Sequence, residues 1–574
     1  MHTAEEGATS MRTGHTTYSR EGSMKKGMII AIVAVLIIGV IALAAGVLLR
    51  DRGQDVAADA EPEEEVLRIG LRKLTTIDPA LGANDPEVMF NSLQYDYLID
   101  ILPDGDLSPN LATGWEISDD GLVYTFTLRE GVTFEDGTPF TAEDVVFTFE
   151  RLVSAGSSIV ALLGQRQVGE TEAGDPILEP TWSVEAVDDL TARFTLEEPN
   201  ADFLYGVASR FALILQEGSD NVNVLADGAD PYVNFNGTGP FILTDYQPDQ
   251  RATYVANENY WMDGAPALDG IELIFFDDDQ SQLDALQSSA IDFVIKVPDD
   301  LLDTLESIPA VTSITRPTNT HPVVRLRADE GSIGEDVRMR QAFKFATDRE
   351  LINLDVLDGA GTVGNNDPIG PTYGALYNEM PNRDYDPEAA KELIAEVYED
   401  GAGNGFIEVV DGEPRVQVPF YVGATFEYPL VAEFLQQQWA EAGIDVELNV
   451  VPENVYYAEG ENNWINTQLG MTAWGTRPTP QEYLSVAYTT GAPFNESAWS
   501  KAELDRLAAE AAQEADIDER AALYKQISTI FLESGPIIIP YFRPVVGGYR
   551  DVVEGLDMHN FPGRTDFRTV SLAE

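Results

Sequence analysis

The chain has 574 residues, of which 44% are hydrophobic and 9% aromatic, so it can bury a large core and is expected to fold as a globular protein. It carries 98 acidic against 35 basic residues and a formal net charge of −63, which argues against a nucleic-acid partner because phosphates need a basic surface. Cysteine is absent, which excludes disulfides, thiolate catalysis, cysteine-bound metal and a lipidated N-terminal cysteine.

The first predicted element is an uninterrupted apolar run, Met28–Leu49. A helix of this length spans about 33 Å, enough to cross a bilayer core. Four basic residues precede the run and acidic residues follow it, so the positive-inside rule predicts a cytoplasmic tail at 1–27 and a large extracytoplasmic domain. The run is longer than the core of a signal peptide, although Ala42–Ala44 would serve as a weak cleavage site. We therefore predict a single-pass cell-membrane anchor at 28–49, followed by an acidic linker at 50–65.

After the linker, strand-like and helical patterns alternate irregularly, which is typical of mixed α/β lobes. Alternating apolar and polar residues predict strands at Glu65–Leu71, Leu122–Leu128, Ala192–Leu196 and Gly270–Phe276. Thr141 followed by Asp144 predicts a capped helix over Ala142–Leu152, with its apolar residues on one face.

The second half of the chain is more helical. A periodicity of 3.6 residues predicts helices over Met339–Asn353, Asp386–Glu399, Tyr428–Ala442, Lys501–Gln513 and Asp518–Ser534. Gly443 is expected to end the third of these helices before a strand at Val446–Val450, a unit typical of an α/β lobe.

Several sequence blocks follow one another in a distinctive order. They include Pro109–Ala112 with Trp115–Leu152, Gly237–Phe241 (GTGPF), Asn257–Trp261 (NENYW), Ala290–Asp292, Val337–Glu350 (VRMRQAFKFATDRE), Tyr385–Lys391, Ala473–Trp474, Glu503–Asp505 and Ile537–Tyr541. On these blocks, which span about 66–549, the chain resembles the large solute-binding proteins of the peptide/nickel ABC-importer family.

The resemblance implies an α/β, periplasmic-binding-protein-like fold of two lobes, with an extra domain enlarging the first lobe. Lobe I would comprise 66–98, 226–316 and 540–574, the extra domain 99–225, and lobe II 317–539. Crossing segments would join the lobes, which close on the ligand by a hinge motion because the ligand binds the closed form better.

The resemblance also implies a binding protein without catalysis or a cofactor, and we expect a monomer. It would bind a peptide or peptide-like ligand between the lobes and deliver it to the transmembrane permease subunits of an ABC importer with their ATPases. Opines, oligosaccharides and metal chelates remain open as ligands. The alternatives are a membrane-anchored extracellular hydrolase and a ligand sensor, which would need a separate signalling partner because the predicted tail is short.

The block Ala473–Pro478 (AWGTRP) carries the main prediction for the ligand site. In peptide-binding relatives the tryptophan lines the pocket, and an acidic residue three positions later pairs with the amino group of the peptide. Here Trp474 is present, but Arg477 stands in place of the acid, and a guanidinium suits a carboxylate or phosphate. We predict that Arg477 faces an anionic part of the ligand; the alternative is a structural arginine that bridges the lobes.

Two further groups of ligand contacts follow from the resemblance. Asn91, Tyr95 and Asp96 occupy the place where the first lobe meets the ligand, with a buried helix or strand edge as the alternative. Arg325 and Arg327 lie where the chain crosses toward the pocket and would supply a second anionic contact, with a surface salt bridge as the alternative.

No metal or catalytic centre is predicted. Only His321 and His559 follow the predicted anchor, and no Gly-x-Ser-x-Gly elbow accompanies them. Glu399–Gly405 partly resembles a calcium loop, but Ala402 occupies a ligand position, so an acidic turn is the preferred interpretation. The acidic surplus is spread along the chain, which favours a solvated surface over an acidic trap for a cationic ligand.

Overall fold

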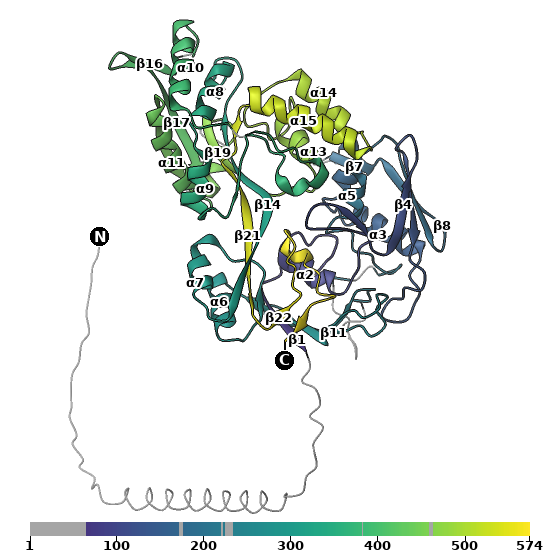
Figure 1. The fold of residues 1–574 in the computed structure, drawn as a ribbon. Helices are drawn as coiled ribbons and strands as arrows, with labels where there is room; N and C mark the ends of the chain where they lie inside the picture. The colour runs from purple at the N-terminus through teal and green to yellow at the C-terminus, as the bar shows by residue number, and fades with distance from the viewer. Residues whose placement is uncertain are drawn as a thin grey trace, which may run out of the picture. The chain divides into compact units, whose positions relative to one another are not determined.

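The computed structural model describes residues 65–170, 176–219, 222–223, 234–381, 383–403, 405–458 and 463–573 (Figure 1). These residues belong to one compact unit, Glu64–Glu574. The predicted cytoplasmic tail, anchor and all of the acidic linker except Glu65 lie outside the described residues. Within the described ranges, no helix is both long enough and apolar enough to cross a membrane.

A mixed sheet of 13 strands runs through the unit. Its main path has the order β10, β11, β12, β1, β13, β21, β14, β19, β17, β16. The bounds are β1 Val66–Arg72, β10 Phe241–Gln247, β11 Arg251–Ala256, β12 Gly270–Phe276, β13 Phe293–Val294, β14 Val311–Leu326, β16 Ile407–Val410, β17 Glu413–Gly423, β19 Leu469–Trp474 and β21 Tyr541–Arg550. Off this path, β15 (Thr362–Val363) pairs with β21, β18 (Ile444–Val451) with β17, and β20 (Ile537–Ile538) with β14.

Strand β14 joins the two halves of this sheet. Its first part, Val311–Arg316, pairs with β21, and its last part, His321–Leu326, pairs with β19. The register with β21 shifts between Arg316 and Thr320, where Pro317 cannot donate a ladder hydrogen bond. Figure 1 shows β14 and β21 side by side between the part that carries β17 and the part that carries β1. They are therefore the strands that cross from one part to the other.

The part around β1 follows the predicted alternation. β1 pairs in parallel with β12, and Leu67, Ile69 and Leu71 are fully buried in one hydrophobic core. The other elements here are α2 Asp85–Ser92, α6 Asp279–Gln287, η1 Asp299–Leu301, α7 Leu302–Glu306, β22 Val553–Glu554, η4 Pro562–Arg564 and β23 Ser571–Leu572. C-terminal residues thus pack beside the N-terminal end of the described chain, with Phe567 in the same core as β1.

A separate antiparallel sheet of four strands lies within 99–225, in the order β4, β5, β9, β8. Helix α3 (Ala142–Ser154) packs on it, with Phe149 against Phe194 at 4.8 Å between ring centroids. The predicted capping box of Thr141 and Asp144 is confirmed. The remaining bounds are β2 Ile99–Ile101, β3 Leu107–Pro109, β4 Ala112–Ile117, β5 Val123–Leu128, α4 Val160–Leu163, β6 Gln165–Glu170, β7 Pro176–Pro180, β8 Trp182–Asp188, β9 Thr191–Leu196 and α5 Phe203–Val207.

The part around β17 contains most of the predicted helices. Its helical elements are α8 Val337–Phe345, α9 Arg349–Leu357, η2 Pro371–Leu376, α10 Pro387–Glu399, α11 Tyr428–Glu441, α12 Glu453–Tyr456, α13 Pro480–Tyr483, the π-helical η3 Leu484–Tyr488, α14 Ala502–Ala511 and α15 Ile517–Ser534. Gly443 has a φ of +81° and ends α11 before β18, as predicted.

The prediction of one helix over Met339–Asn353 is wrong. The chain forms two helices, α8 and α9, separated at Ala346–Asp348. The Asp348 side chain accepts a hydrogen bond from the Leu351 amide and so starts a new helix. The separation follows from this capping and from contacts with α11 that no local periodicity reveals.

Buried hydrophobic side chains form distinct clusters rather than one core. One surrounds β1 and β12, one fills the sheet of β5 and β9, and one lies between β17 and helices α10 and α11. The lobe boundaries proposed at 98/99, 225/226, 316/317 and 539/540 stay predictions. A further cluster surrounds η2, α13 and η3, and it is this cluster and the one around β5 and β9 that supply apolar residues to the cavity described below.

Candidate ligand-binding site

A cavity of about 560 Å³ lies where three parts of the chain meet. One wall comes from the segments around α4 and α5, a second from η2, α13 and the loop before α13, and a third from β2 and C-terminal residues 559–564. A cavity of this volume matches the range of small-molecule sites. No single segment of the sequence contains more than part of it.

Arg477 lies on the second wall. Strand β19 ends at Trp474, and Pro480 begins α13 at a position where a missing N–H is tolerated, so Arg477 falls in the short loop between them. Its Nε is buried, has no hydrogen-bond partner among the residues that the structure describes, and lies 3.9 Å from Glu482 Oε1. The Tyr373 hydroxyl donates to the Arg477 carbonyl at 3.0 Å, which holds the loop backbone.

Asp202 and Arg210 contribute charged groups to the first wall. Asp202 precedes α5, forms an ion pair with Arg520 of α15, and accepts a hydrogen bond from Thr479 Oγ1 at 2.6 Å. Arg210 follows α5, and its guanidinium lies 4.9 Å from the ring centroid of Phe211. The Asp202 carboxylate is therefore committed to protein partners, whereas Arg210 is held mainly by an aromatic contact.

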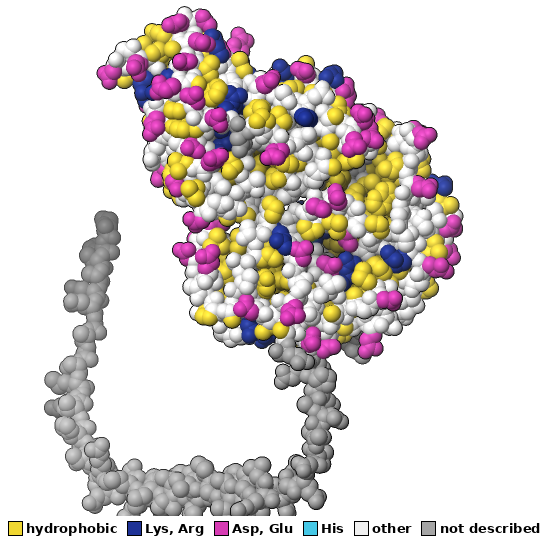
Figure 2. All heavy atoms as spheres, viewed as in Figure 1, with side chains coloured by type: hydrophobic (Ala, Val, Ile, Leu, Met, Phe, Trp, Pro, Cys, Tyr) yellow, Lys and Arg dark blue, Asp and Glu magenta, His cyan; other side chains and the backbone are white. Residues whose placement is uncertain are grey.

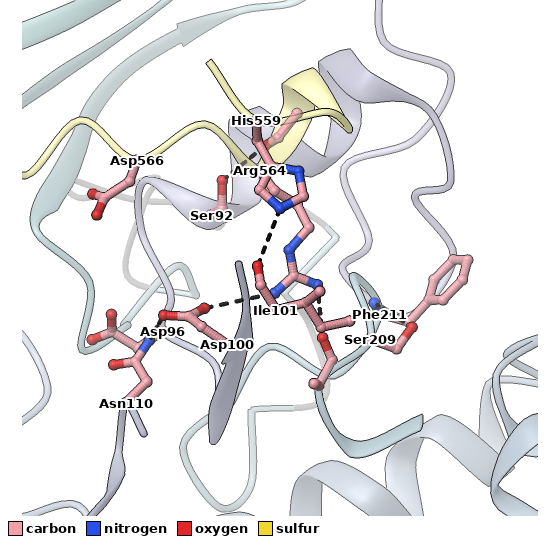
Figure 3. A network of polar contacts seen from close by, with 12 residues as sticks. Ser92, Asp96, Asp100, Ile101, Asn110, Ser209, Phe211, His559, Arg564 and Asp566 are labelled. Atoms are coloured by element: carbon pink, nitrogen blue, oxygen red, sulfur yellow. Dashed lines mark hydrogen bonds and ion pairs between the residues drawn. The ribbon is translucent and has the colours of Figure 1, made fainter. Parts of the chain in front are cut away.

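Arg564 and His559 belong to the C-terminal wall and also line a second, adjoining cavity of about 310 Å³. Figure 3 shows the Arg564 guanidinium between Asp100 and His559. Arg564 Nη1 donates to the Ala208 carbonyl at 2.6 Å, and Nη2 lies 3.6 Å from Asp100 Oδ1. The network ties the C-terminal segment to β2 and to the turn after α5.

The charge of the cavity differs from that of the surface. Figure 2 shows Asp and Glu side chains spread over the visible face of the described unit. Inside the cavity, burial raises the pKa of Glu482, while Arg477 acts in the opposite direction. Burial lowers the pKa of Arg210, while Asp85 and Glu482 oppose that shift. Arg477, Arg210 and Arg564 therefore face lining acids that are either committed elsewhere or weakened as anions.

Trp474, Arg325 and Arg327, the other residues predicted for this side of the site, do not line the large cavity. Trp474 is buried, and its Nε1 donates to Glu496 Oε1 at 3.0 Å. Its ring lies 5.6 Å from the Arg477 guanidinium carbon, so it stands behind Arg477 rather than on the wall of the large cavity. Arg325 is 1% exposed and is paired with Glu496 at 3.2 Å, and Arg327 pairs with Asp329 at 2.8 Å.

The residues predicted near the first lobe lie away from the large cavity. Asn91 is buried in α2 and donates to the Glu87 carbonyl at 2.9 Å. Tyr95 and Asp96 line the second cavity. Asp96 accepts hydrogen bonds from Thr238, Tyr260 and Trp261, and its burial raises its pKa to about 6. Of the predicted contacts, only Arg477 lines the large cavity; a ligand role for any of them stays a prediction.

Several lining residues escaped prediction from the sequence. Arg210, Tyr205, Tyr373, Glu482 and Arg564 lie in stretches without a motif. Glu482 follows Arg477 by five positions, and this short spacing is a local sign that its carboxylate could pair with the guanidinium. Arg210 and Arg564 come together only through the tertiary fold.

His321 makes the stability of the unit depend on pH. It is fully buried in β14, donates from Nδ1 to the Asn319 carbonyl at 2.7 Å, and burial lowers its pKa from 6.5 to about 4. The unfolded chain binds the proton first, so this contribution to stability is present above pH 6.5 and is lost as pH falls toward 4, by about 3 kcal/mol in total. Denaturant unfolding of the wild type and of His321→Gln at pH 4 to 7 measures it. We expect the difference between the two free energies to shrink as pH falls; parallel curves would contradict the prediction.

Comparison with known proteins gives consistent similarities. Residues 106–495 match the model of a protein family described as "Bacterial extracellular solute-binding proteins, family 5 Middle". Heme-binding protein A of Haemophilus influenzae is 31% identical over 449 residues, covering 75% of this chain and 78% of that protein. The dipeptide-binding protein of Escherichia coli K12 is 29% identical over 476 residues, covering 79% and 85%. The solved structure of HbpA2 from Haemophilus parasuis is 27% identical with a TM-score of 0.71, covering 89% of this chain and 100% of that one.

Proposed function

Because the chain belongs to the bacterial extracellular solute-binding proteins of family 5, we propose that it binds a peptide or peptide-like ligand with an anionic group in the large cavity and delivers it to an ABC permease. Family membership confirms the predicted α/β, periplasmic-binding-protein-like fold. The chain is a binding protein of transport and not an enzyme, so the hydrolase alternative falls away. The same family membership favours a role in transport over the role of a ligand sensor.

Arg477 is the observation that carries the proposal. It lines a cavity of about 560 Å³, its Nε is buried without a hydrogen-bond partner among the described residues, and its nearest acid is 3.9 Å away. A carboxylate or phosphate of the ligand would supply the missing acceptors, because a guanidinium binds such groups through paired, charge-assisted hydrogen bonds. The Escherichia coli relative is a dipeptide-binding protein, which supports peptides as the first ligand class to test.

The proposed function is tested on the compact unit from Glu64 onward, purified without denaturation. Native mass spectrometry would identify a co-purified small molecule. After that ligand has been stripped, its re-addition is expected to raise the melting temperature, because a ligand that binds only the folded state stabilises it. A bare protein that shows no thermal shift with peptides, anionic peptides or metal chelates would count against the proposal.

Replacing Arg477 by glutamine is expected to weaken binding of the anionic ligand by roughly 10- to 100-fold, the loss of a hydrogen bond to a charged group. The melting temperature should change little, because the side chain is 37% exposed and its ion pair with Glu482 is long. Isothermal titration calorimetry measures the affinity, and Arg477→Lys, which keeps the charge but not the paired donors, should fall between. Unchanged affinity in Arg477→Gln would exclude a ligand contact.

The predicted anchor at 28–49 completes the proposal. A tether would keep the binding unit outside the cell, close to the permease that receives the ligand. Membrane fractionation with and without carbonate, followed by mass determination of the N-terminus, tests this placement. A shortened protein in the soluble fraction would contradict the anchor and indicate a cleaved signal peptide instead.

A further inference from the structure

We propose that the ligand carries two separate anionic groups, and that Arg210 and Arg564 form the binding site for the second one. The inference rests on the proposed function, because it assigns the ligand class of the same cavity. Arg477 projects from the wall formed by α13 and η2, whereas Arg210 and Arg564 come from two other walls. The first anionic group would meet Arg477 and the second would meet this pair.

Arg210 has the free donors that such a site requires. Among the residues that the structure describes, no carboxylate lies within ion-pair distance of Arg210 and no hydrogen-bond acceptor is assigned to it. Its guanidinium carbon lies 4.9 Å and 5.0 Å from the ring centroids of Phe211 and Phe561. Two aromatic rings therefore fix the orientation of the guanidinium without using up its N–H groups.

Arg564 adds a second, more deeply buried guanidinium. Its side chain is 6% exposed, and its carbon lies 4.1 Å from the ring centroid of Tyr97. Nη1 donates to the Ala208 carbonyl, but the buried Nη2 makes no hydrogen bond within the described ranges and lies 3.6 Å from Asp100 Oδ1. A buried donor without an acceptor is costly, so an acceptor supplied by the ligand would remove a penalty already present in the free protein.

The acids near Arg210 do not cancel its positive charge. Asp202 is occupied by Arg520 and Thr479. Asp85, whose charge acts on Arg210, is half-buried and accepts a hydrogen bond from the Gly563 amide at 2.9 Å. Glu482 is the remaining lining acid, and it is shared between the fields of Arg477 and Arg210. A cavity with three lining arginines in a chain of net charge −63 selects an anionic ligand against the sign of its surroundings.

Two carboxylates on a short peptide, one at its C-terminus and one on a side chain, are the chemistry that fits this arrangement. The cavity is large enough for a short peptide, and each carboxylate would accept charge-assisted hydrogen bonds from a guanidinium. A peptide with glutamine in place of glutamate keeps the size and the C-terminal carboxylate but loses the second charge. Matched peptides that differ only in glutamate or glutamine therefore test whether the site binds a second carboxylate.

The test is a competition experiment on the ligand-free unit from Glu64 onward, with an equimolar library of di-, tri- and tetrapeptides in matched Glu/Gln pairs. Native mass spectrometry reads which member of each pair is bound. For the wild type we expect at least one pair in which the Glu peptide is enriched about 10-fold or more, the discrimination of one charged hydrogen-bonded contact. The preference should fall as salt is raised, because screening weakens a charge contact in a site open to solvent.

Arg210→Gln is expected to bring that enrichment close to 1 while the Gln peptide still binds, and Arg210→Lys should keep part of it. Arg193→Gln is the matched control, since Arg193 is an exposed arginine of β9 paired with Glu185, and it should bind like the wild type. Equal binding of Glu and Gln peptides by the wild type would overturn the inference and leave peptide binding intact. Binding of no peptide at all would overturn the proposed function and the inference together.

Discussion

Replacing Arg325 by methionine is expected to lower the free energy of unfolding by about 3–5 kcal/mol, the usual cost of leaving one partner of a buried ion pair uncompensated. Arg325 is 1% exposed and donates to Glu496, to both the carbonyl and the hydroxyl of Thr467, and to the Trp464 carbonyl. Methionine fills a similar volume but leaves the Glu496 carboxylate buried beside only two neutral donors, Thr472 and Trp474.

Chemical denaturation followed by tryptophan fluorescence measures this loss. Arg327→Met is the matched control, because Arg327 lies two residues further along and its pair with Asp329 is partly exposed, so it should cost less than about 1 kcal/mol. The double variant Arg325→Met with Glu496→Gln should recover part of the stability, since the unpaired charge is gone. Equal effects of Arg325→Met and Arg327→Met would show that the buried pair is not special. Loss of ligand binding in a stably folded Arg325→Met would instead support its predicted ligand contact.

Replacing Asp202 by alanine is expected to destabilise the unit by a similar amount, about 3–5 kcal/mol, and to weaken ligand binding as well. Asp202 and Arg520 are both buried; burial acts to lower the pKa of Arg520, but Asp202 and Tyr524 together raise that pKa above its usual value. Arg520 also donates to the Ala201 carbonyl at 3.0 Å, and Thr479 donates to Asp202. These contacts join the segment before α5 to α13 and α15.

The same contacts span the large cavity, because Asp202 lies on one wall and Thr479 directly precedes α13 on another. A further direct link between these parts is the hydrogen bond from the Ala201 amide to the Ala512 carbonyl at 2.9 Å, so loss of the Asp202 contacts would weaken the connection. Small-angle X-ray scattering should therefore give a larger radius of gyration for Asp202→Ala, and calorimetry a lower ligand affinity. Glu510→Ala is the control, since it removes an exposed i,i+4 pair with Arg506 on α14 and should cost only about 0.3–0.5 kcal/mol. A variant with wild-type stability and affinity would show that the walls do not depend on this ion pair.

The sequence by itself determined those elements whose signals are local. The capping box of Thr141 and Asp144 and the apolar stripe after it predict α3, and the glycine at 443 after a helical periodicity predicts the junction of α11 and β18. Both depend on interactions over three or four residues, which any reading of the chain can detect. The break between α8 and α9 was missed because partners on α11 help to hold it: Gln438 accepts the Asp348 amide, and Trp439 donates to Thr347.

The order of the sequence blocks also suffices for the family, because each block is a short run that can be recognised from its own residues. The lining of the cavity was decided by the tertiary structure. Arg477 and Arg325 are the same kind of residue in comparable blocks, yet one faces a cavity and the other faces Glu496, which lies 171 residues further along the chain. Charge interactions act through space over a few ångströms, so the fold alone decides which of the many acids meets which arginine and which arginines are left for the ligand.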